Sequence, residues 1–182
     1  MQVRSADGDD VPPVDGVAIV ERLLGSVPPS WCIGLREIVI TTAGTRAPDR
    51  PPRRSWVHGR KIPMRHVLAL YHGSATADPA WIEVFVDRIV ASVPRMVLRM
   101  PPARDLLFAL VVFHELGHHV HQRVRPENRD PETVADDWAA QFTVMFVRRR
   151  YPYLLPLLRV VRWCIQCRKV LQRLRARIRR RR

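Results

Sequence analysis

Two short stretches decide the fold: HELGH at residues 114–118 and ETVAD at residues 132–136. In an α-helix, residues four apart lie one turn apart on one face, so the imidazoles of His114 and His118 can face one Zn²⁺ ion. Glu115 lies beside them, where its carboxylate can reach a water molecule at the metal without being a ligand. The first stretch therefore predicts a zinc site with a general base; a histidine-rich core helix is the alternative interpretation.

The second stretch supplies two further carboxylates, one helical turn apart. Glu132 is a candidate for the third zinc ligand. Asp136 can accept a hydrogen bond from the second ring N–H of a ligand histidine, which would fix the tautomer and orientation of that ring. Ala135 and Ala139 are small, so this helix could approach the HELGH helix closely.

Two long helices are expected to carry these stretches. Residues 105–124 contain no proline, and their first half is nearly all apolar, as in a helix that is buried in a core. Asp130 followed by Pro131 predicts an N-cap and the first turn of a helix over about residues 132–149. Apolar residues at helical spacing predict a shorter helix at residues 17–24.

Runs of β-branched residues predict three strands before the HELGH helix, at residues 35–42, 67–71 and 81–86. The Pro- and Arg-rich residues 43–64 between the first two runs form a longer connection than most compact domains contain, which indicates a functional flap or a mobile loop. Together with the helices, the strands predict an α+β fold with a small mixed or antiparallel sheet.

The chain has 182 residues, which is the length of one ordinary domain. Apolar residues make up 47% of it and charged residues 26%, a composition that is typical of globular proteins. We expect a flexible leader at residues 1–13, a catalytic domain at residues 14–150, and a basic C-terminal extension at residues 151–182. The net charge is +14, and no Asp or Glu follows Asp137. The excess of positive charge is therefore a feature of the C-terminal part.

Apolar residues at heptad spacing between Leu157 and Ile178 predict an amphipathic helix in this extension. This helix could dock on the domain, pair with a second copy, or lie on an anionic surface. Basic residues without any acid over residues 159–182 make nucleic acid and an anionic membrane surface the candidate partners, and a solvated tail is the alternative. Cys164 and Cys167 lie in the apolar seam, which favours packing over metal binding.

Three cysteines are too few for a disulfide framework, which indicates a reducing compartment. The acidic N-terminus lacks the apolar core of a secretory signal, and the longest apolar run, residues 106–113, is shorter than the roughly 20 residues that span a bilayer. The sequence therefore predicts a cytoplasmic protein.

The remaining histidines receive no role in the predicted zinc site. His121 lies about 10 Å along the helix axis from His114, too far to share its metal ion, so we expect His121 and His119 at the rim or surface. Exposed positions in loops or at strand ends are expected for three others: His58, His66 and His72.

HELGH followed by E-x-x-A-D-D-W-A at residues 132–139 resembles the minimal gluzincin metallopeptidases, above all the ImmA/IrrE type with its H-E-x-G-H and E-x-x-A-[ND]-x-[FW]-A segments. The resemblance covers about residues 15–147 and implies a zincin-like fold. It also implies that His114, His118 and Glu132 bind zinc and that Glu115 is the base. By position, residues 81–86 match the family's strand along the active-site cleft.

These observations predict a zinc-dependent metallopeptidase that hydrolyses peptide bonds in a protein substrate. The alternative is a protein that associates with nucleic acid or an anionic membrane and has a structural or catalytically idle zinc site. Three protein ligands would favour the enzyme and four the structural site. The candidates to stabilise the transition-state oxyanion are Tyr71, His119, Tyr151 and Tyr153.

Overall fold

The structure, a computed structural model, describes residues 1–5, 14–42, 56–57, 60–61, 67–73, 79–124 and 130–156. The chain falls into two compact units, Met1–Phe146 and Val147–Arg182. The strands are β1 (Gln2–Ser5), β2 (Leu35–Thr41), β3 (Trp56–Val57), β4 (Arg60–Lys61), β5 (Ala69–His72) and β6 (Ala80–Phe85). The helices are α1 (Gly16–Leu24), η1 (Pro29–Cys32), α2 (Val86–Ala91), α3 (Arg95–Arg99), α4 (Pro101–Val124), α5 (Pro131–Arg150) and η3 (Pro152–Leu154).

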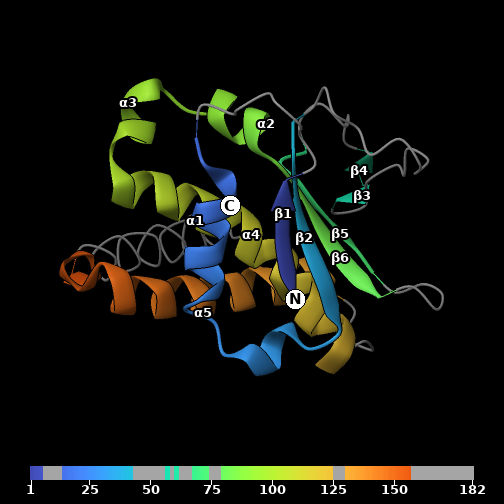
Figure 1. The fold of residues 1–182 in the computed structure, drawn as a ribbon. Helices are drawn as coiled ribbons and strands as arrows, with labels where there is room; N and C mark the ends of the chain where they lie inside the picture. Colours follow the sequence, from blue (N-terminus) through green and yellow to red (C-terminus); the bar gives the residue numbers. More distant parts are fainter. Residues whose placement is uncertain are drawn as a thin grey trace, which may run out of the picture. The chain divides into compact units, whose positions relative to one another are not determined.

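The first unit contains a four-stranded mixed sheet in the order β1-β2-β6-β5. The strands β1, β2 and β6 are parallel, and β5 runs antiparallel to β6. Figure 1 shows α1 and α4 on one side of this sheet. The architecture is therefore the expected mixed α+β arrangement with a small sheet.

The central strands β2 and β6 are apolar because both of their faces are covered. Ile38, Ile82 and Val84 have no exposed surface, and Val39 on the opposite face of β2 is only 3% exposed. Such strands appear in a sequence as continuous apolar runs. This is why these two strands were predictable.

The prediction of a flexible leader at residues 1–13 is wrong for the first part of this segment. Gln2–Ser5 form β1, which pairs in parallel with Glu37–Ile40 of β2. Arg4 Nε donates a hydrogen bond of 2.6 Å to Glu37 Oε2 across this pair. The strand has no apolar alternation of its own, so its conformation depends on a partner more than thirty residues away. Residues 6–13 lie outside the described part.

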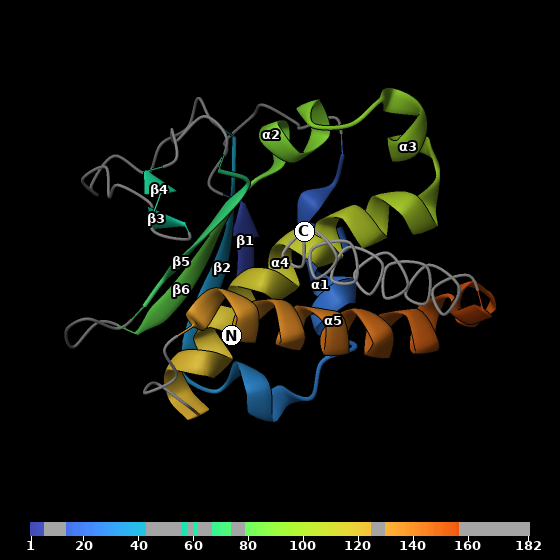
Figure 2. The same cartoon turned by 180° about the vertical axis from the view of Figure 1, so that it is seen from behind.

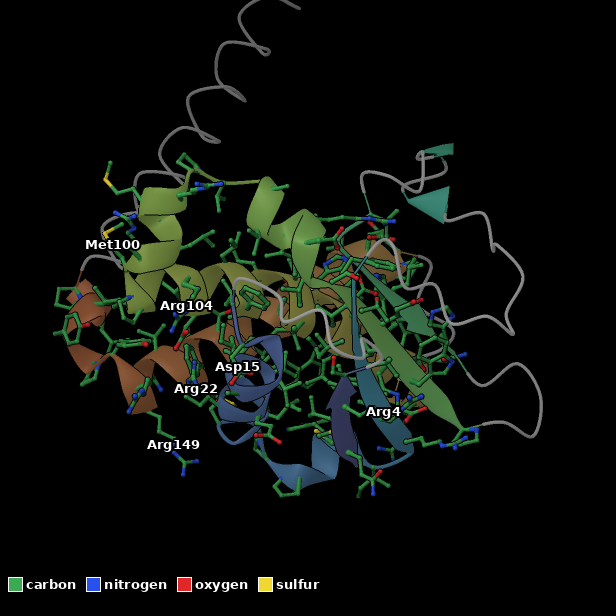
Figure 3. All side chains as sticks on the ribbon, turned by 45° about the horizontal axis from the view of Figure 1, so that its top comes forward. Arg4, Asp15, Arg22, Met100, Arg104 and Arg149 are labelled. Carbon is green, nitrogen blue, oxygen red and sulfur yellow. The ribbon has the colours of Figure 1, made fainter. Side chains whose placement is uncertain are left out.

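Helix α1 matches the prediction, and Asp15 caps it by accepting a hydrogen bond of 2.9 Å from the Ala18 amide. Helix α4 begins at Pro101, earlier than predicted, because prolines are tolerated in a first turn where N–H groups have no partner. Figure 3 labels Arg22 of α1 and Arg104 of α4, which both approach the buried Asp105. This charge cluster links the two helices.

Helix α5 begins as predicted, since Asp130 Oδ1 accepts a hydrogen bond of 3.2 Å from the Thr133 amide. It crosses α4, as Figure 2 shows. The ring of Phe113 on α4 lies 5.8 Å from that of Phe142 and 6.5 Å from that of Phe146 on α5. Aromatic packing therefore holds the two helices together.

Several short elements were not predicted: η1, α2, α3 and the antiparallel pair β3–β4. Val86, expected at the end of a strand, instead begins α2. The pair β3–β4 falls within residues 43–64, where a flap or mobile loop was expected, and the rest of that segment lies outside the described residues.

The second unit is described over residues 147–156. The Tyr151 amide donates a hydrogen bond of 2.8 Å to the Val147 carbonyl at the end of α5, and η3 follows. The predicted amphipathic helix, with Cys164 and Cys167, lies outside the described residues. None of the helices in the described residues combines the length and hydropathy that crossing a bilayer requires.

Candidate metal centre

The structure brings together three of the residues singled out in the sequence. The Nε2 atoms of His114 and His118 on α4 lie 3.1 Å apart. Glu132 Oε2, from the first turn of α5, lies 3.4 Å from His114 Nε2 and 3.8 Å from His118 Nε2. This group could bind a metal ion, and all three side chains are half-buried.

The spacing of these three donor atoms fits one small divalent ion. Zinc bonds of about 2.0–2.1 Å at tetrahedral angles put ligand atoms roughly 3.3 Å apart. The observed separations of 3.1, 3.4 and 3.8 Å lie around that value. A metal ion could therefore be held with little rearrangement of the side chains.

Gly117, in the middle of HELGH, allows α5 to approach α4. A Cβ atom at this position would lie 2.5 Å from the Ala135 carbonyl oxygen and 2.8 Å from the Ala135 Cα, both backbone atoms. Real Cβ contacts are essentially never that short. The missing side chain therefore brings the first turn of α5, with Glu132, to the histidines.

Asp136 orients one histidine of the group. Its Oδ1 atom lies 2.9 Å from His114 Nδ1, while its side chain is 69% exposed. A carboxylate accepts a hydrogen bond, so Nδ1 of His114 carries the proton, and in the neutral ring Nε2 keeps a free electron pair. That electron pair faces His118 and Glu132.

His118 is held in its neutral form. Burial, together with the neighbouring imidazoles of His114 and His121, lowers its pKa to about 4 against an opposite effect of Asp136. A metal-binding imidazole must be unprotonated. At neutral pH the His118 imidazole is therefore in the neutral form that metal binding requires.

Glu115 lies on the side of α4 that faces β5. Its Oε2 atom accepts a hydrogen bond of 2.8 Å from the Tyr71 amide. Burial raises the pKa of Glu115 to about 7, and this effect exceeds the opposite effects of His114 and the Tyr71 amide. Glu115 is therefore adjacent to the metal-binding group without belonging to it.

The strand beside the site is β5, and this corrects the assignment of residues 81–86. Strand β6 pairs with β2 on one side and with β5 on the other. Within the described sheet β1 and β5 are the edge strands, and the Tyr71 amide of β5 points away from β6 towards Glu115. Only an edge strand has free backbone groups that can pair with another chain.

The expectation of rim or surface positions for His119 and His121 is wrong, because both are buried. His119 Nε2 lies 3.0 Å from the Ile33 carbonyl oxygen, and its Nδ1 lies 3.2 Å from the Tyr71 hydroxyl. The Tyr71 hydroxyl also donates a hydrogen bond of 2.7 Å to Gln122 Oε1. His119 therefore links α4 to β5 and to the segment after η1.

This network also bears on the oxyanion candidates. The hydroxyl of Tyr71 and both ring nitrogens of His119 already have partners, and burial raises the pKa of Tyr71 to about 12. Tyr151 and Tyr153 belong to the second unit, where their rings lie 6.1 Å apart. The spacing of residues 115, 119 and 122 along one helix face could have indicated this network in the sequence.

His72 ends β5, as expected of a strand-end residue, but it is half-buried and has two partners. Its ring stacks on Trp81 with centroids 3.8 Å apart, and its Nε2 lies 3.3 Å from Glu83 Oε2. His58 and His66 lie outside the described residues.

The metal-binding group contains three protein donors. Within the described ranges, no fourth His, Cys, Asp or Glu joins His114, His118 and Glu132. Comparisons with protein-family models, with curated proteins and with solved structures give no match for this chain. Its function is therefore inferred from the geometry of this group and its neighbours.

Proposed function

We propose that this protein is a zinc metallopeptidase with a zincin-like fold, similar to the minimal gluzincins. The observation that carries the proposal is the convergence of His114, His118 and Glu132, with the Glu115 carboxylate next to them and outside the group. The resemblance of HELGH and the downstream E-x-x-A-D-D-W-A segment to the ImmA/IrrE type supports the same function.

Two imidazoles and one carboxylate form a donor set that suits zinc and leaves a coordination position open. A zinc ion in such a site would lower the pKa of a water molecule and would polarise a peptide carbonyl as a Lewis acid. Structural zinc sites have four protein ligands. The group found among the described residues has three, which supports a catalytic site.

Glu115 is assigned the proton transfers. Its carboxylate would accept a proton from the attacking water and later deliver it to the nitrogen of the departing amine. The Tyr71 amide, which donates to Oε2, holds the carboxylate on the side of α4 that faces the sheet. Asp136 would keep the Nε2 atom of His114 directed at the other donors.

The edge strand β5 gives an extended peptide a backbone to pair with. A substrate strand added to β5 would lie along the side of the sheet where the Tyr71 amide and Glu115 meet. Backbone pairing of this kind provides affinity without demanding a particular sequence. This arrangement supports a peptide as the substrate.

The proposal is tested by metal analysis and by hydrolysis of a quenched fluorogenic peptide library. The purified wild-type protein should contain one zinc ion per chain, and Glu132→Ala should lose it. Glu115→Gln should keep the zinc and lose hydrolysis by at least about a hundredfold, the usual contribution of a positioned acid–base group.

Two results would contradict the proposal. Zinc retained in full by Glu132→Ala would remove Glu132 from the ligand set. Unchanged hydrolysis by Glu115→Gln would remove Glu115 from the reaction. Glu21→Gln on the exposed face of α1 serves as the control, since it removes a carboxylate outside the site.

A further inference from the structure

A second candidate site lies between η1, the end of α4 and the first turns of α5. It is a cavity of about 480 Å³, and its lining includes Trp31, His121, Asp137, Trp138 and Gln141. None of these residues belongs to the metal-binding group or contacts it through a hydrogen bond. The cavity therefore needs its own explanation.

Two indole rings form the apolar wall of the cavity. The rings of Trp31 and Trp138 have centroids 4.6 Å apart and are inclined at 52°. Trp138 also stacks on the fully buried Phe142 at 5.6 Å and 25°, which fixes its orientation. Both tryptophans are half-buried, so part of each ring is accessible from the cavity.

The polar groups of the cavity include two hydrogen-bond acceptors, the Asp137 carboxylate and the Gln141 carbonyl. Asp137 and Gln141 are exposed and lie four residues apart, on one face of α5. His121 is only 7% exposed, and its Nε2 atom has no hydrogen-bond partner among the described residues. Because that Nε2 atom is itself buried, Asp137 and Gln141 are the polar groups that a ligand in the cavity can reach.

We propose that this cavity binds a guanidinium group, such as that of an arginine side chain. A guanidinium is planar and stacks on indole rings, and it carries five N–H donors. Those donors match the Asp137 carboxylate and the Gln141 carbonyl. Among the described residues that line the cavity there is no Lys or Arg, and Asp137 supplies the formal charge.

This site is independent of the proposed peptidase activity. Asp136 contacts His114, whereas the next residue, Asp137, lines the cavity, because successive residues of a helix point about 100° apart. The two neighbouring carboxylates therefore provide a matched pair. Asp136→Asn should affect metal binding, and Asp137→Asn should affect guanidinium binding.

The experiment titrates the full chain with N-acetyl-arginine-amide and follows the indole N–H signals of its five tryptophans by NMR. Trp31→Phe and Trp138→Phe assign two of these signals. We expect both to shift in a saturable manner. N-acetyl-citrulline-amide, a neutral analogue of the same shape, should cause no shift. Asp137→Asn should weaken binding about fivefold, as for an exposed ion pair, and Asp136→Asn should leave it unchanged.

The source of the guanidinium is distinguished by a third ligand, agmatine, which has no peptide backbone. Tighter binding of N-acetyl-arginine-amide than of agmatine supports an arginine in a peptide, and the reverse order supports a free guanidino compound. Equal shifts with the citrulline analogue, or no effect of Asp137→Asn, would overturn the proposal. Zinc loss in Asp136→Asn with intact guanidinium binding would bear on the metal site alone.

Discussion

Gly117 is the residue on which the approach of α5 to α4 depends. It has a helical conformation that any residue can adopt, so its requirement is steric: the Ala135 carbonyl oxygen occupies the place of a Cβ atom. The sequence motif alone does not reveal this, because the contact joins residues on two helices. The absence of a side chain at this position therefore allows Glu132 to lie close to His114 and His118.

Gly117→Ala should destabilise the protein by about 1–3 kcal/mol, since the added methyl group pushes two backbones apart. It should also weaken metal binding, because Glu132 moves with α5. Urea denaturation and zinc titration check both effects. Gly25→Ala is the control: its Cβ atom would lie 3.4 Å from the nearest atom, so its stability should change by less than about 1 kcal/mol. Equal behaviour of the two variants would contradict this account.

Asp136 contacts His114 of the candidate metal centre and is not itself one of its three donors. Asp136→Asn should lower zinc affinity by about 10- to 100-fold, the usual effect of removing the partner of a ligand histidine. Competition with a chromophoric chelator measures this change. Asp137→Asn, one residue along the same helix, should keep the wild-type affinity. A similar loss in both variants would indicate a general effect of charge instead.

At the scale of elements, the start of α5 is the feature that positions Glu132. Asp130 accepts hydrogen bonds from the amide and the hydroxyl of Thr133, at 3.2 and 2.6 Å. This cap and Pro131 define the first helical turn, in which Glu132 is the second residue. The local sequence therefore controls where the third donor lies.

Asp130→Ala should cost about 1 kcal/mol of folding free energy and should also weaken zinc binding, because the turn that carries Glu132 frays. Asp15→Ala removes the equivalent cap of α1 and should cost a similar free energy with no change in zinc affinity. Urea denaturation and chelator competition separate the two effects. Zinc affinity lowered equally by both variants would refute the link between the cap and the site.

The long elements could be predicted because their signals are local. Apolar spacing and capping residues lie within each of α1, α4 and α5, and the apolar runs of β2 and β6 reflect burial on both faces. The strand β1 has no such signal, since Gln2–Ser5 pair with residues far along the chain. Helix α2 directly follows the strand β6, and helix α3 follows Pro94. Both helices are short, so their apolar periodicity is obscured by these neighbours.

At the scale of the whole molecule, a metal ion would join α4 to α5 and so stabilise the first unit. A ligand that binds only the folded state at 100 times its dissociation constant adds about 2.7 kcal/mol. For a chain of this size, that corresponds to a rise in Tm of roughly 5–10 °C.

We expect this rise when zinc is added to metal-free protein, and its reversal by a chelator, as followed by differential scanning calorimetry. His114→Ala should abolish the rise, because it removes one of the three donors. A zinc-dependent rise of the same size in His114→Ala would contradict the assignment of the site.

The amino-acid sequence was enough to predict the α+β class, the two long helices and the pairing of His114 with His118, because helical spacing and capping are local properties, whereas the position of Glu132 beside them depends on the contact of Gly117 with Ala135. Three-dimensional contacts were needed to show that β5 is an edge strand, that His119 and His121 are buried, and that Trp31 meets Trp138. These features depend on contacts between distant residues, such as His119 and Ile33. No local pattern encodes which face of a helix another segment will cover.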